Sequence, residues 1–419
     1  MESTIPVHPN LTLRMWRDLT PLPFPLRPAN KTSPHVLIIG GGWASIVDHI
    51  TSQIAGALWE YPPAVCGQHE GKVSLEESKR WSMVSYHCYA AIAEDPELAK
   101  KSGIEMKQGR FYFPTRLEDD HEQYCKMQEI MASGVKGFRR YPSFDLENQN
   151  VIAKNQKIED MYEIDSPMID SDQGMQWLMK LVQDKGGLLR SETIHGALLE
   201  QESELLERFQ ADVIVNATGL GAQELAGDDT CYPVRGALVR VVNDGLHFPR
   251  VTQAHTVSAD VSGAANEIVF IVPRSDNTLL LGGIAEDKVG DTNLILDSPV
   301  IKEMRQRCVD FIPLLENAKL HPSYPLAVGL RPFRGGNVRV ERELRKSAKA
   351  GNGKPSRIVH SYGQGGAGWT LAFGCAADIC TLVEEAIADA PPRSLADDAT
   401  KQASTDKEPK HDQPLRARL

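Results

Sequence analysis

Apolar residues along this chain recur with two spacings, one typical of helices and one typical of buried strands. Spacings of three and four residues predict amphipathic helices in residues 75–100, Ser171–Lys185 and Val300–Pro313. Short runs rich in β-branched residues predict strands at His35–Ile39, at Ala211–Asn216 and in a group between Ala237 and Ile284. The chain is therefore expected to combine helices with buried strands.

Glycine-rich turns follow the first two of these strands, and a third turn precedes a helix near the C-terminus. Gly40–Gly42 follows the first strand and Ala217–Gly219 the second. The third turn lies in Arg357–Asp378, RIVHSYGQGGAGWTLAFGCAAD. Glycine lacks a Cβ, so such turns let backbone N–H groups approach a ligand closely, and the helix expected at about Trp369–Ala388 would add the positive end of its dipole. An ordinary tight connection is the simpler alternative for a glycine-rich turn taken alone.

Composition and charge narrow the class of protein. A chain of 419 residues with 41% hydrophobic content is long enough for more than one domain. A net charge of −10 and the absence of Lys or Arg runs argue against a nucleic-acid partner. No window approaches the roughly 18–20 apolar residues of a membrane span, and the N-terminal stretch lacks the apolar core of a secretory signal. We expect a soluble, intracellular protein with no membrane partner.

The seven cysteines form no CxxC pair. This spacing indicates neither a zinc site nor a disulfide framework. No metal site is predicted, and small apolar positions in the interior are expected for the cysteines.

The string from Ile358 to Ala376 resembles the C-terminal signature of the D-amino-acid oxidase family of flavoenzymes. It begins with IVHSYGQGGAGWT and ends with GCA. The resemblance covers about residues 35 to 388, and its other segments follow in family order: Thr51–Glu60 (TSQIAGALWE), Ala211–Gly219 (ADVIVNATG), Tyr232–Gly236 (YPVRG), Phe270–Arg274 (FIVPR) and Gly329–Arg334 (GLRPFR).

The resemblance implies an α/β fold. A doubly wound, Rossmann-like FAD-binding domain would be interleaved with a mixed α+β substrate domain. The ranges expected for the FAD-binding domain are 35–75, 165–235 and 325–388, and those for the substrate domain are 76–164 and 236–324. Residues 1–34 are expected to form an irregular arm, and the polar residues 389–419 a disordered tail.

The resemblance also implies a reaction. A D-amino acid would give its α-hydrogen as hydride to FAD, and the products would be a 2-oxo acid, ammonia and, from dioxygen, hydrogen peroxide. The cofactor carries this chemistry while the protein holds the substrate. Two alternatives are a glycine- or sarcosine-type amine oxidase and a catalytically silent relative that acts as a binding protein.

Site residues follow from the matching motifs. Arg331 takes the family's position for binding the substrate carboxylate, which suits the fork of a guanidinium, and Arg334 is a weaker candidate. Gly366 matches the glycine whose carbonyl receives the substrate amine, and Phe270 takes a substrate-binding position. Positions matching the family's cofactor contacts are Gly40, Gly42, Thr51, Ser52, Gly56, Ala57, Leu58, Thr218, Gly219, Arg235, Gly365, Gly366, Gly368, Trp369 and Thr370.

The substrate side departs from the family pattern. Phe270 and Asn266 stand where well-known members have tyrosines, and no tyrosine occurs between Pro233 and Ser323. Hydride transfer needs no protein base at the α-carbon, so this change does not exclude catalysis, and the substrate specificity should differ. His255 is a candidate substitute for a missing hydroxyl, although a surface histidine without such a role is the simpler interpretation.

The dinucleotide-binding fingerprint departs from the usual pattern more strongly than the substrate side does. The usual pattern is Gly-x-Gly-x-x-Gly, a helix, and a strand ending in an acidic residue about 20 positions on. Here Ser45 replaces the last glycine, and eight residues separate Gly42 from Thr51. The first helix and second strand need roughly 30 residues, so we predict that this unit is missing. The alternative, a helix at Ser45–Leu58 with Glu60 as the ribose ligand, leaves no room for a strand.

The C-terminal residues Ala417-Arg418-Leu419 are a conservative variant of the peroxisomal address Ser-Lys-Leu. An oxidase that makes hydrogen peroxide fits that compartment. The expected location is the peroxisome, reached through an import receptor, and otherwise the cytoplasm. The other expected partners are a small amino acid and dioxygen.

Overall fold

The computed structural model describes residues 34–40, 51–63, 72–142, 152–153, 156–190, 192–257, 268–275, 277–345 and 355–392. Gly42 and Asn266 lie outside the described residues, as do the predicted arm apart from Pro34 and the tail beyond residue 392. Within the described part, no helix is long and apolar enough to cross a membrane.

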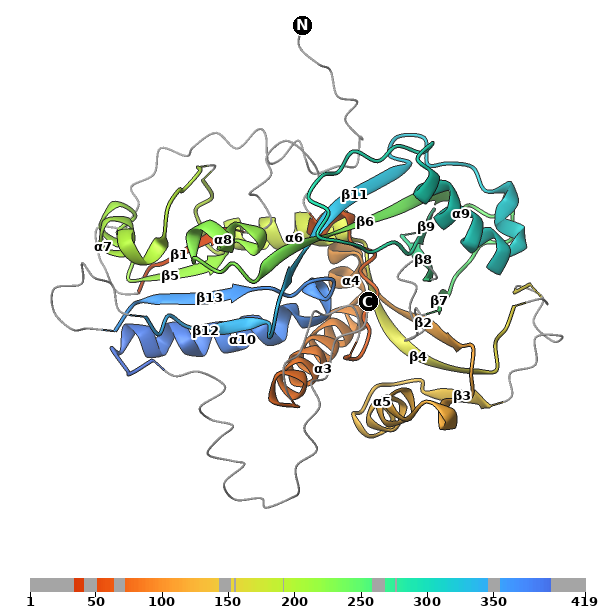
Figure 1. The fold of residues 1–419 in the computed structure, drawn as a ribbon, viewed down its shortest axis with the longest axis horizontal. Coiled ribbons are helices and arrows are strands. Elements are labelled where there is room, and N and C mark those ends of the chain that lie inside the picture. Colours follow the sequence, from red (N-terminus) through yellow and green to blue (C-terminus); the bar gives the residue numbers. More distant parts are fainter. Residues whose placement is uncertain are drawn as a thin grey trace, which may run out of the picture.

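A smaller sheet has the strand order β1-β5-β13-β12 (Figure 1). Its strands are β1 (Val36–Gly40), β5 (Val213–Ala217), β12 (Arg339–Arg342) and β13 (Ile358–Tyr362). Strands β1, β5 and β13 are parallel to one another, and β12 runs antiparallel to β13. The strands predicted at 35–39 and 211–216 are thereby confirmed to within two residues.

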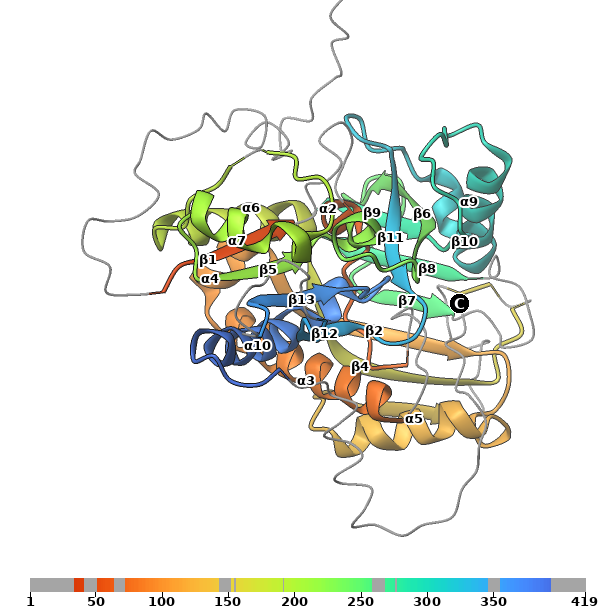
Figure 2. The ribbon, with the colours of Figure 1, turned by 60° about the vertical axis from the view of Figure 1, so that its left-hand side comes forward.

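Helices cover both faces of this sheet, as in a doubly wound fold. On one face, α10 (Gly368–Ile387) and α3 (Lys72–Glu94) share an apolar cluster with β5 and β13. On the other face, α7 (Leu198–Arg208) packs with its leucines against β1, β5 and β13. Figure 2 shows α7 and α10 on opposite sides of the strands.

Strand β1 forms one edge of the sheet. Leu37 and Ile39 pack toward α7, but Val36 is 40% exposed and Ile38 is 63% exposed. Within the described residues, no strand pairs with the free side of β1. A second strand and first helix would cover this edge and this face, so the exposure agrees with the predicted loss of that unit.

The larger sheet has the order β10-β6-β9-β8-β7-β2-β4-β3, with β11 paired to β6. Its pairs are antiparallel except for the parallel pair of β2 and β7. The strands are β2 (Ile104–Phe113), β3 (Arg139–Pro142), β4 (Asp160–Ile169), β6 (Cys231–Val242), β7 (Ala254–Val257), β8 (Val269–Arg274), β9 (Thr278–Gly282), β10 (Glu286–Asp287) and β11 (Leu326–Arg334). The predicted group of strands between residues 237 and 284 is confirmed.

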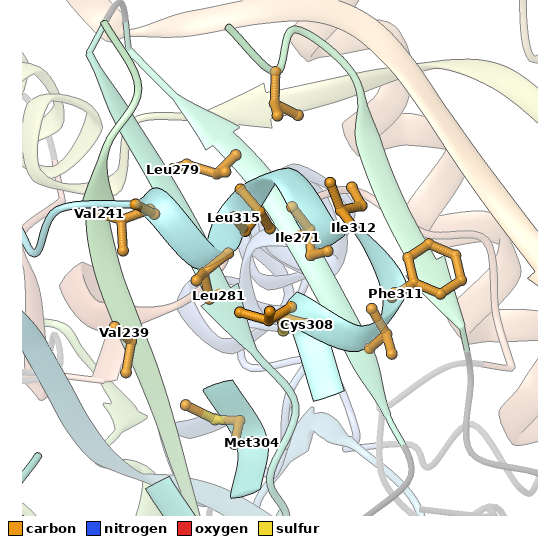
Figure 3. Packing of buried hydrophobic residues seen from close by; sticks show 14 of the residues in the cluster. Val239, Val241, Ile271, Leu279, Leu281, Met304, Cys308, Phe311, Ile312 and Leu315 are labelled. Carbon is orange, nitrogen blue, oxygen red and sulfur yellow. The ribbon is translucent and has the colours of Figure 1, made fainter. Parts of the chain in front are cut away.

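Helix α9 (Pro299–Phe311) covers one face of the larger sheet. Met304, Cys308 and Phe311 contact the apolar side chains of β6, β8 and β9, such as Val239 and Ile271 (Figure 3). This is the helix predicted at 300–313. Cys308 is buried there, as are Cys231 and Cys375 elsewhere, which confirms the expected interior positions for these three. Cys88 and Cys125 are only half-buried and Cys380 is exposed, so the expectation is wrong for Cys380.

The helix predicted over 75–100 is two helices. Helix α3 ends at Glu94, and α4 (Pro96–Ser102) begins after Asp95, whose carboxylate accepts hydrogen bonds from the N–H groups of Glu97 and Leu98. An N-cap followed by proline at the first helical position is a strong start signal. The remaining short elements are α2 (Thr51–Ile54), η1 (Leu117–Asp119), α5 (His121–Ala132), α6 (Ser171–Asp184), η3 (Gly219–Gly221), α8 (Ala222–Leu225) and η4 (Pro313–Asn317).

The two sheets divide the chain differently from the expected ranges. The expected boundary at residue 165 falls inside β4, and β11, from a range assigned to the FAD-binding domain, pairs with β6 in the larger sheet. Helix α3, from a range assigned to the substrate domain, contacts α10 closely, because a Cβ added to Gly374 would overlap the main chain of Trp81. Long strands and one long helix thus pass from one domain to the other.

Candidate active site

The segment Thr51–Leu58 connects the two domains. The Thr51 hydroxyl donates to the carbonyl of Leu330 on β11 (2.8 Å), and the indole N–H of Trp369 donates to the carbonyl of Ser52 (2.8 Å). Three segments that are far apart in sequence, each matching a family motif, therefore meet at α2. The structure brings these predicted site residues together.

Two glycines let this segment lie directly on the larger sheet. A Cβ on Gly329 of β11 would overlap the Ile54 side chain, and a Cβ on Gly56 would overlap the ring of Phe270 on β8. Phe270 and Leu58 share an apolar cluster. Phe270, predicted to contact the substrate, therefore lies next to the segment predicted to contact the flavin. Sequence reasoning did not identify Gly329, although it begins a matching motif.

Arg331 extends from β11 over Gly236 of β6. An added Cβ at Gly236 would lie 2.5 Å from the Arg331 guanidinium carbon, so the missing side chain is what makes room for this group. The guanidinium donates to the main-chain carbonyls of Ile284 (3.1 Å) and Arg235 (3.5 Å). Burial lowers the pKa of Arg331 to about 10, which leaves it positively charged at neutral pH.

The two neighbouring arginines are committed to ion pairs. Arg235 binds Glu286 (2.7 Å) and Asp291 (2.6 Å), and Arg334 binds Asp228 (2.7 Å). Among the described ion pairs, none involves Arg331. Of the three, Arg331 is therefore the one whose fork is left to bind a carboxylate ligand.

The glycine loop before α10 rests on β11. Gly363 and Gly365 have positive φ (85° and 57°), and the N–H of Gly365 donates to the carbonyl of Pro332 (3.0 Å). Gly366 and Gly368 are exposed, and an added Cβ at Gly368 would meet no atom within 4 Å. The N-cap residue of α10 is Ala367, whose side chain accepts no hydrogen bond from the first N–H groups of the helix.

The carboxyl ends of β1 and β5 form the second predicted contact area. Gly40 has φ +113°, and a Cβ there would overlap the carbonyl of Ala217. Gly219 also has positive φ (56°), and its Cα lies close to Pro332 of β11, 3.3 Å from an added Cβ. Gly40 and Gly219 thus have backbone conformations that are unfavourable for residues with a side chain.

A buried polar chain, missed from the sequence, holds Thr218 in place. The Thr218 hydroxyl donates to Asn216 (2.7 Å), the Asn216 amide contacts His360 (3.2 Å), and His360 contacts Glu343 (3.2 Å). Burial opposes ionisation of Glu343, but hydrogen bonds from His360 and Arg345 outweigh it and hold its pKa below the ordinary range. A polar side chain inside the apolar strand IVHSY was the available signal.

His255 does not substitute for the missing tyrosine hydroxyl. Its cross-strand neighbour is Ile271, which faces α9, whereas Phe270 faces the opposite side of the sheet. The imidazole is buried, stacks on Tyr112 and bonds its hydroxyl (2.9 Å). Desolvation, and then the charge of Arg110, lower the pKa of His255 to about 3, so it is neutral at physiological pH.

Glu60 also has another partner. Its carboxylate bonds the ammonium of Lys126 on α5 (2.7 Å), and α2 is only four residues long. This ion pair and the short helix do not support the alternative in which residues 45–58 form a helix and Glu60 binds a ribose.

Comparison with known proteins identifies the class. The profile of the DAO family, described as FAD dependent oxidoreductase, matches residues 48–382. A D-amino-acid oxidase of Streptomyces coelicolor is 29% identical over 335 residues, which is 80% of this chain and 86% of that protein. Human D-aspartate oxidase is 28% identical over 314 residues, covering 75% and 79%.

Solved structures agree on the fold. The glycine oxidase of Geobacillus kaustophilus aligns with a TM-score of 0.59 at 18% identity, covering 84% of this chain and 95% of its own. An L-alpha-glycerophosphate oxidase of Mycoplasma pneumoniae with FAD bound aligns with a TM-score of 0.59 at 15% identity, covering 84% and 94%. The chain belongs to the DAO family of FAD-dependent oxidoreductases, and its cofactor is FAD.

The described residues fit the flavin end of FAD better than the adenosine end. On the side where the resemblance implies the flavin would bind, Gly366 and Gly368 are exposed, no side chain caps α10, and Ser52 of the Thr51–Leu58 segment is hydrogen-bonded to Trp369. On the side where the resemblance implies the adenosine would bind, Gly40 and Thr218 are present, but β1 has no neighbour on its free side within the described part. We therefore expect most of the binding energy for FAD to come from the flavin end.

Proposed function

We propose that this protein oxidises D-amino acids with dioxygen as the final electron acceptor. The observation that carries this proposal is the Arg331 guanidinium, which lies over Gly236 and bonds only to main-chain carbonyls in the described part of the chain. A bidentate arginine is well suited to a substrate carboxylate. The names of the relatives, D-amino-acid oxidase and D-aspartate oxidase, support the same substrate class.

In this function, the protein's own groups bind and orient the substrate. Arg331 holds the carboxylate, the carbonyl of Gly366 accepts a hydrogen bond from the amine, and Phe270 and Leu58 form an apolar wall. Bound FAD supplies the acceptor for the α-hydrogen and two electrons. The resulting imino acid takes up water to give a 2-oxo acid and ammonia, and dioxygen takes the two electrons and two protons to give hydrogen peroxide.

A peroxide-coupled assay tests this function. Purified protein with added FAD is offered neutral, acidic and basic D-amino acids, their L-enantiomers, glycine and sarcosine. The proposal expects peroxide from D-amino acids and loss of this activity in Arg331→Met. Preference for glycine or sarcosine would instead support the amine oxidase alternative, and preference for L-enantiomers would overturn the proposal.

A catalytically silent binding protein is the second candidate. The exposed β1 edge favours it, because the missing unit normally helps to hold the adenosine. Bound FAD together with no peroxide from any substrate of the panel would support this alternative.

We also propose that the protein is imported into peroxisomes through its C-terminal residues Ala417-Arg418-Leu419. The tripeptide variant and the expected peroxide product support this location. A fluorescent protein fused to the N-terminus should give a punctate pattern that coincides with a peroxisomal marker. Removal of the last three residues should make the signal diffuse, and an unchanged pattern after removal would contradict the proposal.

A further inference from the structure

Two buried arginines, Arg240 and Arg274, extend from the larger sheet, and the second of them contacts the segment Thr51–Leu58. Arg240 on β6 and Arg274 on β8 are each 4% exposed. Arg240 bonds Asp172 at the start of α6 (3.0 Å), and its guanidinium lies over the ring of Tyr324. Arg274 donates to the carbonyl of Ala55.

Most of their hydrogen-bonding capacity is unused. Arg240 Nε and Nη2, Arg274 Nε and Nη1, and Asp172 Oδ1 are buried without a partner. In the described residues the Asp172 carboxylate contacts only Arg240, and Arg274 has only a main-chain carbonyl as partner. Burial and the charge of Arg240 lower the pKa of Arg274 to about 10. Buried N–H groups of a cation that lack acceptors are costly, so these groups are expected to bind an anion or ordered water.

The arginines lie on the same face of the sheet as the substrate residues. Along β8, Phe270, Val272 and Arg274 alternate onto one face, and the register places Arg240, Leu280 and Val272 side by side across β6, β9 and β8. Gly236, over which Arg331 lies, is on that face too. Four residues of strand, about 13 Å, separate Gly236 from Arg240.

The tip of Arg274 comes still closer to the site. Its guanidinium bonds the carbonyl of Ala55, and the next residue, Gly56, contacts the ring of Phe270. The side chains of Phe270 and Arg274 therefore converge on the same peptide, although their α-carbons are four residues apart.

We propose that Arg274 and Arg240 form a subsite for the second carboxylate of a dicarboxylic substrate, so that acidic D-amino acids are the substrates of choice. This inference rests on the proposed function in one respect, namely that Arg331 binds the first carboxylate. The planar forks offer donors that match the two oxygens of a carboxylate. A neutral side chain would leave these donors without acceptors, which the site should disfavour.

Binding of two matched inhibitors to the full-length chain tests the subsite. Glutarate and valerate have the same five-carbon chain and differ by one terminal carboxylate. Calorimetric titrations at constant ionic strength, with and without FAD, should show glutarate binding at least about tenfold more tightly than valerate, as expected for charge-assisted hydrogen bonds.

Variants separate the two carboxylate sites. In Arg274→Met, glutarate affinity should fall to that of valerate while valerate affinity stays the same. Arg331→Met should weaken both ligands. Arg80→Met serves as the control, because Arg80 is an exposed arginine paired with Asp378, and both affinities should be unchanged. Arg240→Met and Arg274→Lys provide a second loss and a conservative rescue if Arg274→Met folds poorly.

The outcomes distinguish this inference from the proposed function. Equal affinities for glutarate and valerate, or a preference that survives Arg274→Met, would overturn the subsite and show that water fills it. Failure to oxidise any D-amino acid, with the glutarate preference intact, would overturn the proposed function and leave the subsite standing.

Discussion

The contact between Gly236 and Arg331 gives the sharpest prediction for the active site. In Gly236→Ala, the added Cβ would lie 2.5 Å from Cζ and Nη1 and 2.6 Å from Nη2 of Arg331. Gly236 lies in a regular strand and has no positive φ, so the backbone accepts alanine. The guanidinium must therefore move by about 1 Å, and a displacement of that size can cost on the order of 100-fold in rate.

We expect kcat/KM for D-amino acids to fall roughly 100-fold in Gly236→Ala, mainly through a higher KM, because the proposed role of Arg331 is to bind substrate both before and during the reaction. Gly290→Ala is the matched control, since an added Cβ there makes an ordinary contact with Pro233 (3.8 Å). Steady-state peroxide assays and melting temperatures of both variants measure the effect. Activity of Gly236→Ala within threefold of the unmodified protein would refute the role given to Arg331.

Three further predictions concern stability and surface. The pKa of His255 is lowered to about 3 in the folded protein from an unfolded value near 6.5, so its contribution to folding stability is complete above pH 6.5 and decreases as the pH falls. Denaturant unfolding should show that the free energy of unfolding falls by about 2 kcal/mol by pH 5. This loss should be absent in His255→Gln. A pH-independent stability of the unmodified protein over this range would contradict the buried, neutral imidazole. Ile38→Lys should change stability by less than about 0.5 kcal/mol and should reduce self-association measured by light scattering. The control Ile295→Lys changes a 64% exposed position away from any strand and should leave self-association unchanged. Equal effects of the two substitutions on self-association would argue against an exposed β1 edge. Gly56→Ala should destabilise the protein by about 1–3 kcal/mol, because the added Cβ overlaps Phe270. A second substitution in the same chain, Phe270→Ala, should relieve part of this loss. Additive effects of the two substitutions on stability would refute the contact.

The sequence predicted most elements of the fold because each carries a local signal. Apolar spacing gave α6 and α9, and β-branched runs gave β1 and β5. The break between α3 and α4 was missed although Asp95-Pro96 is a standard start signal, since the apolar spacing continues across it. The exchange of strands between domains depends on long-range pairing, such as that of β11 with β6, which no local pattern reports.

The candidate site was predictable in part for the same reason. Arg331 and the glycine loop lie in continuous motifs, and the structure places both beside α2. The position of Arg331 over Gly236 and the placement of Arg240 and Arg274 on one face of the sheet depend on strand register and could not be read from spacing. The role suggested for His255 was wrong because the register, rather than the residue type, determines which face of β7 it occupies.

Binding of FAD to the purified chain tests the central claim most directly. The segments expected to hold the flavin contact each other, whereas β1, expected near the adenosine, has no neighbour on its free side within the described residues. A titration followed by visible absorption should therefore show saturable uptake of one flavin per chain, with FMN binding within about tenfold of FAD. A protein that stays colourless at saturating FAD would contradict the claim that this chain forms a working flavin site.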